Sequence, residues 1–184
     1  MSDKKNKHKH KRWNRAAKAS QFTRGAGGEM IYVGRHYSFQ GDERSYRQGM
    51  RQRMALAAVM AVAHLAGGMM PVPALYNTWY VIAPYMLTFF AVVSLVWAVC
   101  RMVYWGNPLR EYVYDATVKQ IPIRATLAMI LSMCTLCGQI AYVVTHSLQG
   151  VEYLYTLAFL GLEIVVFVCA FLWKGRENQA LWSI

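Results

Sequence analysis

Four long stretches of the chain are almost free of charged residues, and this pattern limits the fold more than any other feature. They cover residues 54–72, 79–104, 123–146 and 153–173. A helix needs roughly 20 apolar residues, at about 1.5 Å each, to cross a hydrocarbon core of about 30 Å. A helix that is apolar on all sides has no face for water in a soluble protein. The sequence therefore predicts an all-α integral membrane protein, with a four-helix bundle over residues 54–173.

The distribution of basic residues predicts how these spans are oriented. The chain has 20 Lys and Arg against 9 Asp and Glu, and 14 of the 20 lie in residues 1–53. The predicted loops 73–78 and 147–152 contain no Lys or Arg, whereas the loop 105–122 contains both. Basic residues favour the cytoplasmic side of a membrane. We therefore expect a multi-pass protein of the cell membrane with both termini and the 105–122 loop in the cytoplasm.

The segments outside the spans are expected to differ in order. Residues 1–28 form a polybasic, Gly-containing arm, which we predict to be a disordered cytoplasmic tail. Its charge suits anionic lipid, about 1 kcal/mol for each basic residue near such a surface. Its basic tract from Lys4 to Arg15 has one aromatic residue, Trp13, and no stacking series, so nucleic acid is not an expected partner. Residues 174–184 form a cytoplasmic C-terminal tail.

The juxtamembrane segment and the middle loop are predicted to contain short ordered elements. In the segment 29–53, residues 29–41 are rich in Ile, Val, Tyr and Phe around Gly34, which favours an extended or hairpin-like element. From about Asp42, the composition favours a helix that continues into the first span. In the middle loop, Asn107-Pro108 has the form of a helix start, which predicts a short helix on the membrane face.

The cysteines offer one candidate catalytic motif. Of the 4 cysteines, Cys134 and Cys137 form a CxxC. A four-span protein with a CxxC resembles quinone-linked thiol oxidoreductases of the vitamin K epoxide reductase type. In that family the dithiol lies near the outer end of a helix, and a second cysteine pair in an extracytoplasmic loop serves it. Here the motif lies at mid-span and neither outer loop contains a cysteine, so the resemblance ends at the motif.

Helical geometry favours a packing role for these cysteines. At about 100° per residue, Cys134, Gly138 and Ala141 share one stripe, with Cys137 beside it. Small residues allow membrane helices to approach closely. We therefore predict that Cys134 and Cys137 pack against another helix, and we keep thiol oxidoreduction as an alternative.

The opposite side of the third span carries a polar stripe. Its members follow the spacing of one helix face and are Ser132, Thr135, Gln139, Tyr142 and His146. Such a stripe is costly against lipid, because polar groups in hydrocarbon need hydrogen-bond partners. It is expected to face the interior of the bundle or a neighbouring subunit.

Two ionisable residues lie inside the spans. His64 and Glu163 fall near the same depth as Thr135, close to the bilayer midplane. An intramembrane acid is expensive and by default suggests a function and a partner, and His64 is the expected partner of Glu163. One hypothesis is a proton-titrating or cation-coordinating site made by Glu163, His64 and Gln139. The other is a structural network in which Glu163 donates a hydrogen bond between helices.

Three classes of function follow, in order of preference. The first is a non-enzymatic accessory, scaffold or regulatory membrane component, acting as a homo-oligomer or in a larger membrane complex. The second is a small oligomeric proton- or cation-coupled transporter or channel that uses His64 and Glu163, and the third is the thiol oxidoreductase. The sequence contains no P-loop, HExxH or GxSxG motif and no cluster of acids. It therefore predicts no catalytic residue, metal site or cofactor.

Overall fold

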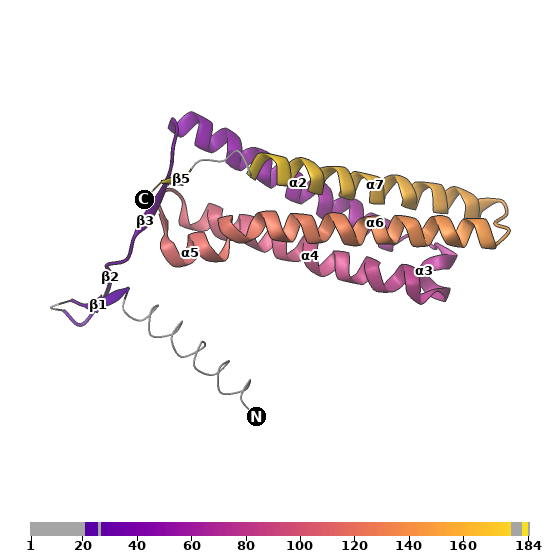
Figure 1. Cartoon of the computed structure of the whole chain (residues 1–184), viewed down its shortest axis with the longest axis horizontal. Coiled ribbons are helices and arrows are strands. Elements are labelled where there is room, and N and C mark those ends of the chain that lie inside the picture. The colour runs from indigo at the N-terminus through magenta and orange to yellow at the C-terminus, as the bar shows by residue number, and fades with distance from the viewer. Residues whose placement is uncertain (1–20, 26, 178–181, 184) are drawn as a thin grey trace, which may run out of the picture.

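The long helices of the protein lie side by side, as the computed structural model shows (Figure 1). The structure describes residues 21–25, 27–177 and 182–183. The four long helices are α2 (Glu43–Gly68), α4 (Trp79–Trp105), α6 (Ile121–Thr145) and α7 (Val151–Glu177). Shorter helices are α3 (Pro73–Asn77), α5 (Glu111–Ala116) and the 3₁₀ helix η1 (Val118–Gln120). The strands are β1 (Phe22–Arg24), β2 (Met30–Tyr32), β3 (His36–Phe39), β4 (Leu109–Arg110) and β5 (Trp182–Ser183).

Three helical stretches are long and apolar enough to cross a membrane. They are Trp79–Trp105, Glu111–Thr145 and Val151–Glu177, with mean hydropathies of 2.1, 1.9 and 2.3. Large apolar side chains on their outer faces are exposed, among them Phe90, Ile123 and Phe171. In water that exposure would be unfavourable, whereas hydrocarbon solvates it. These are the properties of a membrane protein.

The first long helix, α2, differs from these three. Its apolar part runs only from Met54 to Gly68, with His64 inside it, and its first turns carry Arg47, Arg51 and Arg53. The charged turns and the histidine lower the mean hydropathy of the helix. The helix also ends at Gly68, before the end of the span predicted at 54–72. The length and composition that allow the other three helices to cross a membrane are therefore not matched by α2.

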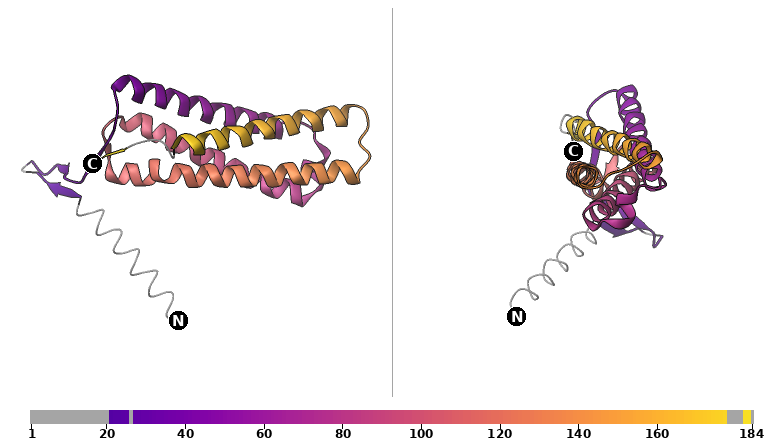
Figure 2. Two further views of the ribbon diagram at one scale, coloured as in Figure 1. Left: turned by 45° about the horizontal axis from the view of Figure 1, so that its top comes forward. Right: turned by 90° about the vertical axis from the view of Figure 1, so that its right-hand side faces the viewer.

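The packing order of the helices differs from their order along the chain. Helix α6 packs against both α4 and α7, and α2 packs against α7 and, less extensively, against α4. The end-on view in Figure 2 shows the four long helices grouped about a common interior. One buried cluster, which includes Met60, Leu95, Met102 and Trp173, fills much of the interior. A second, around Tyr85, Tyr142 and Phe159, fills the end near α3.

Gly138 sets how closely α4 and α6 approach each other. A Cβ atom at this position would lie 2.8 Å from the backbone oxygen of Tyr80 on α4. Backbone atoms cannot move aside as a flexible side chain can, so any larger residue must push the helices apart. This close approach of α4 and α6 matches the use of small residues at membrane helix interfaces.

We expect Gly138→Ala to destabilise the protein by about 1–3 kcal/mol, because it overpacks this contact. The matched control is Gly161→Ala on α7, where an added Cβ meets no atom within 4 Å. The control should be neutral or slightly stabilising, because alanine has the higher helix propensity. Unfolding free energies in mixed micelles measure both changes, and equal effects would contradict the tight crossing.

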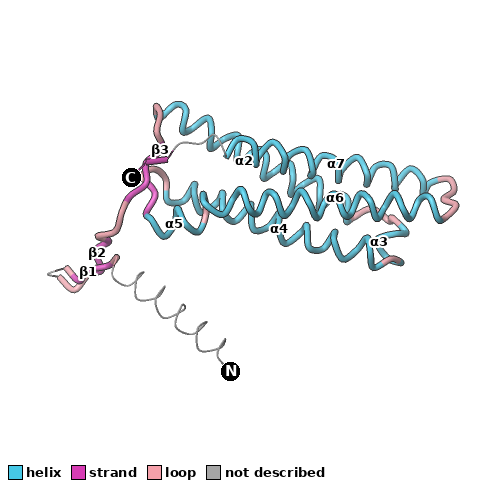
Figure 3. Tube along the Cα trace, viewed as in Figure 1, coloured by secondary structure: helices cyan, strands magenta, loops and turns pink. Residues whose placement is uncertain are grey.

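Strands gather at the end of the bundle where α2 begins and α7 ends (Figure 3). Strand β3 lies in the middle of a three-stranded sheet, antiparallel to β4 on one side and to β5 on the other. Aromatic side chains pack around it: Tyr37 stacks on Tyr114 at 4.2 Å between ring centroids, and Trp182 packs edge-on against Phe39 at 5.6 Å. The sheet therefore joins the juxtamembrane segment, the middle loop and the C-terminal region.

The extended element expected at 29–41 is present but pairs differently from a local hairpin. Strand β2 pairs with β1, which precedes it, whereas β3 pairs with the distant β4 and β5. The composition around Gly34 favoured an extended or hairpin-like element, and local composition contains no signal of these distant partners. Strand β1 also lies within residues 1–28, the arm predicted to be disordered. Residues 1–20 of that arm lie outside the described residues.

Candidate functional site

The two ionisable residues predicted to lie inside spans meet at the interface of α2, α6 and α7. His64 Nδ1 on α2 lies 2.9 Å from Glu163 Oε1 on α7. Ser132 Oγ on α6 lies 3.0 Å from Glu163 Oε2 and 3.1 Å from the backbone oxygen of Glu163. The exposed fractions are 1% for His64 and 0% for both Glu163 and Ser132. Three helices are thus joined through one carboxyl group, which we call the polar centre (His64, Ser132 and Glu163).

Tyr85 on α4 completes the contacts of His64. Its ring stacks on the imidazole with 4.1 Å between centroids, and its hydroxyl donates to the backbone oxygen of His64. A hydrogen bond to a backbone oxygen within a helix fixes the position of that helix turn as well as the side chain. All four long helices therefore contribute to or contact the polar centre. Tyr85 was not among the predicted site residues. Its position inside a predicted span could have indicated it, because a tyrosine hydroxyl in hydrocarbon needs a hydrogen-bond partner.

Two other members of the predicted set remain outside these hydrogen bonds. Thr135 Oγ1 donates to Leu131 O of its own helix at 3.1 Å. Gln139 is fully buried, yet neither atom of its amide has a hydrogen-bond partner among the described residues, and the same holds for Thr156 Oγ1 and His64 Nε2. The structure thus brings together three of the five predicted site residues. Gln139 lies two turns from Ser132 along α6, and no bond joins it to Glu163.

The predicted polar stripe of α6 faces the interior over most of its length. Ser132, Thr135, Gln139 and Tyr142 are all buried, as helical periodicity requires for one face. His146 is exposed at the end of the helix, where its ring stacks on Tyr142 at 4.2 Å. The interior is closed over the polar centre, because the side chains around it leave it 0–1% exposed.

The cysteine prediction was wrong in its placement. Cys134 and Cys137 are exposed on the outer face of α6, and so is Ala141. Only Gly138 of that stripe makes the close helix contact that was predicted for it. The periodicity placed the small residues on one face correctly, but the buried face of α6 is the opposite, polar one. Both thiols are free and face outward.

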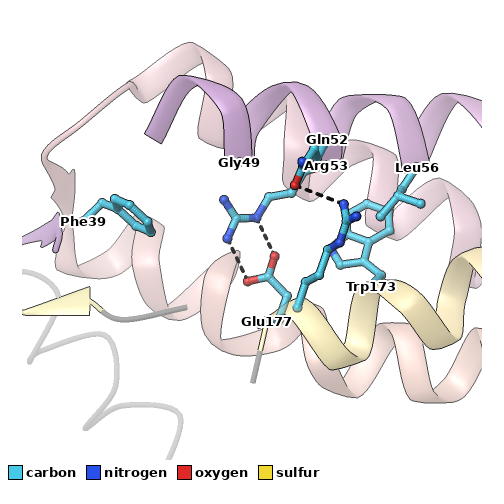
Figure 4. A pocket seen from close by; sticks show the side chains of 8 residues that line it. Phe39, Gly49, Gln52, Arg53, Leu56, Trp173 and Glu177 are labelled. Atoms are coloured by element: carbon cyan, nitrogen blue, oxygen red, sulfur yellow. Dashed lines mark hydrogen bonds and ion pairs between the residues drawn. The ribbon is translucent and has the colours of Figure 1, made fainter. Parts of the chain in front are cut away.

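A buried pair of opposite charges lies at the end where α2 begins, and Figure 4 shows it. Arg53 Nε and Nη2 on α2 both donate to the carboxylate of Glu177 at the end of α7, with 3.2 Å from Nη2 to Oε2. Each residue is 8% exposed. Two parallel N–H to oxygen bonds give such a pair a defined orientation. We call Arg53 and Glu177 the end pair.

From the sequence, Arg53 is one of the 14 basic residues in the segment 1–53, and Glu177 has no expected role. The only available signal was that the two opposite charges flank the same predicted membrane boundary.

Nearby, burial raises the pKa of Tyr46, and the positive charge of Arg53 opposes that shift. The hydroxyl of Tyr46 is buried and has no partner among the described residues.

The chemistry open to these residues is narrow. Within the described part of the chain, no three His, Cys, Asp or Glu side chains gather closely enough to hold a metal ion. The polar centre contains one titratable pair and a hydroxyl, which can share or hold a proton and can join helices. The free thiols of Cys134 and Cys137 are the remaining reactive groups on α6.

Comparisons with known proteins identify no relative of the chain. No protein family model matches the chain, and no curated protein or solved structure gives a significant match.

Proposed function

We propose that the protein is a non-enzymatic membrane component that acts by binding another membrane protein, as an accessory, scaffold or regulatory subunit. The burial of the polar centre carries this proposal, because Glu163 and Ser132 are 0% exposed. A transport site must be reachable from both sides of the membrane in turn, whereas a structural hydrogen-bond network is best kept closed. The polar centre then serves to fix the arrangement of α2, α6 and α7.

Outward-facing groups provide the surface for such a partner. Large apolar side chains cover the outer faces of the long helices, including Phe90, Trp97 and Leu157. Lipid satisfies these faces, and so does a neighbouring transmembrane helix. The aromatic sheet around β3 adds an ordered surface outside the apolar region. Together these features fit a role in recognition.

The location we propose is a cell membrane with four crossings and both termini in the cytoplasm. Support for the fourth crossing comes from α2, which lies beside α7 and places His64 against Glu163. If α7 crosses the membrane, a helix bound to its buried midpoint must enter the same layer. The basic residues at the start of α2 and the end of α7 support a cytoplasmic location for that end.

Single cysteines in a cysteine-free background test this topology. We expect Tyr76→Cys, in the short helix α3 that follows α2, to react with an impermeant maleimide added outside intact cells. Ser45→Cys, at the start of α2, and Asp115→Cys, in the middle loop, should react only after the membrane is opened. All three positions are exposed. Labelling of both Ser45→Cys and Tyr76→Cys from the same side would show that α2 does not cross.

Native purification tests the proposed function. The full chain, extracted from its own membrane in mild detergent and cross-linked, should carry one other membrane protein at fixed stoichiometry. The second arm reconstitutes the purified chain in liposomes and follows internal pH under an imposed proton gradient. We expect no proton flux that depends on Glu163.

Two matched variants show whether any proton flux in the liposome measurement depends on Glu163. Glu163→Gln removes the titratable group of the polar centre, and Glu152→Gln removes an exposed acid from the same helix. Flux in the unmodified protein that only Glu163→Gln abolishes, with unchanged thermal stability, would overturn the accessory role. Proton-coupled transport would then take its place.

A further inference from the structure

A cavity lies beside the end pair, between the start of α2 and the end of α7. Its volume is about 330 Å³. Figure 4 shows the side chains around it, which come from β3, α2 and α7. Gln52, Arg53, Arg176 and Glu177 supply the polar part of its lining, and Phe39, Leu56 and Trp173 supply most of the rest. The cavity is separate from the polar centre, and the proposed function makes no use of it.

The cavity carries a surplus of positive charge. Its lining includes two guanidinium groups and one carboxylate. The carboxylate of Glu177 is occupied by both donors from Arg53. Arg176 Nη1, in contrast, donates to a neutral amide, Gln52 Oε1, at 3.1 Å. A guanidinium has five N–H donors in a planar fork, so Arg176 retains donors and its full charge for a ligand.

A second observation points to a ligand. Trp173 lines the cavity and is 0% exposed, and its indole Nε1 has no hydrogen-bond partner among the described residues. An indole N–H only donates, so the missing partner must be an acceptor. A buried donor left without a partner costs about 1–3 kcal/mol. An acceptor oxygen between Trp173 and Arg176 would satisfy the first and neutralise the second.

The position of the cavity along α7 indicates which kind of molecule supplies that acceptor oxygen. The lining residues Trp173 and Arg176 lie at the end of the apolar part of α7, beside Lys174. Tryptophan and basic residues at that position are typical of the headgroup layer of a membrane. The cavity also has apolar walls in Phe39 and Leu56. A phosphate ester with an attached glycerol and acyl chains has both kinds of surface.

We propose that this cavity binds the phosphate of a membrane phospholipid headgroup, with Arg176 and Trp173 Nε1 as its donors. The end pair forms one wall of the site, and Arg53 does not bind the phosphate because its donors are bound to Glu177. The glycerol portion of the lipid lies against Phe39 and Leu56. This site is distinct from any attraction of lipid to the polybasic arm, because its lining residues belong to β3, α2 and α7.

Native mass spectrometry of the full chain, stripped of lipid in a non-ionic detergent, tests the site. Three probes are titrated: dioctanoyl phosphatidylglycerol, dioctanoylglycerol without phosphate, and inorganic phosphate. We expect saturable binding of one phospholipid molecule per chain. The affinity for dioctanoylglycerol should be at least about tenfold weaker, because a charge-assisted hydrogen bond contributes about that factor. Inorganic phosphate that binds as tightly as the phospholipid would overturn the lipid assignment.

Three variants locate the bound phosphate. Arg176→Gln should weaken phospholipid binding about tenfold, and Trp173→Phe, which keeps the ring but removes the donor, should weaken it severalfold. Lys174→Gln is the control, because it removes the same charge from the same helix end at a position outside the lining. An equal loss for Lys174→Gln and Arg176→Gln would overturn the proposal and assign the binding to general surface charge. So would unchanged binding in both Arg176→Gln and Trp173→Phe.

Discussion

Glu163→Ala should lower the free energy of unfolding by about 3–5 kcal/mol, because it removes the partner of a buried polar group and leaves a cavity in the place of the side chain. The carboxyl group is the partner of His64 Nδ1 and of Ser132 Oγ. Its loss leaves His64 Nδ1 without a partner in a buried interior, and it leaves Ser132 Oγ with only the backbone oxygen of residue 163. Unfolding by dodecyl sulfate in maltoside mixed micelles, followed by circular dichroism, measures the change.

Glu163→Gln is the informative companion of that variant. The glutamine amide keeps the shape, can donate to His64 Nδ1 and can accept from Ser132 Oγ. We therefore expect a loss of no more than about 1 kcal/mol, the net value of one hydrogen bond. Glu152→Ala, at an exposed position on the same helix, should change stability by less than about 0.5 kcal/mol. If Glu163→Ala is as stable as the unmodified protein, the polar centre does not hold the helices together.

Arg53→Met and Glu177→Leu, made separately, should each cost about 3–5 kcal/mol as well. Either change leaves an unpaired charge that is buried, since both residues are only 8% exposed. The double variant replaces the pair with two apolar side chains, so it should regain most of the loss. The same mixed-micelle unfolding, arranged as a double-mutant cycle, gives the coupling energy of the end pair.

A second ion pair on α2 provides the control for that cycle. Arg47 and Glu43 lie 2.5 Å apart, but their side chains are 70% and 76% exposed. An exposed pair with this i,i+4 spacing is worth about 0.3–0.5 kcal/mol. A coupling energy for Arg53 and Glu177 no larger than that of the control would show that the end pair is solvated.

The apolar windows predicted the helices because each window has a length and composition that allow few other structures. Helices α4, α6 and α7 begin and end within a few residues of the predicted 79–104, 123–146 and 153–173. Helical periodicity also predicted that Ser132 and Gln139 face inward. The juxtamembrane helix was expected from about Asp42, and α2 begins at Glu43.

The remaining errors come from contacts between distant parts of the chain. Strand β3 joins β4 and β5, more than 60 residues away, and local composition contains no information on that pairing. The placement of Cys134 failed because periodicity defines faces but does not say which face is buried. The polar face of α6 is buried since Glu163 and His64 lie opposite it, a fact that depends on how three helices assemble.

The packing of α2 has a consequence for biosynthesis. A ribosome makes α2 before the other long helices, yet α2 packs more extensively against α7, which is made last. Until α7 emerges, Arg53 and His64 lack the acids that compensate them, and the first helix is also the least apolar. If α2 crosses the membrane, its stable insertion is therefore a late event that waits for the end of translation. Truncation before α7 should leave α2 as a substrate for membrane quality control.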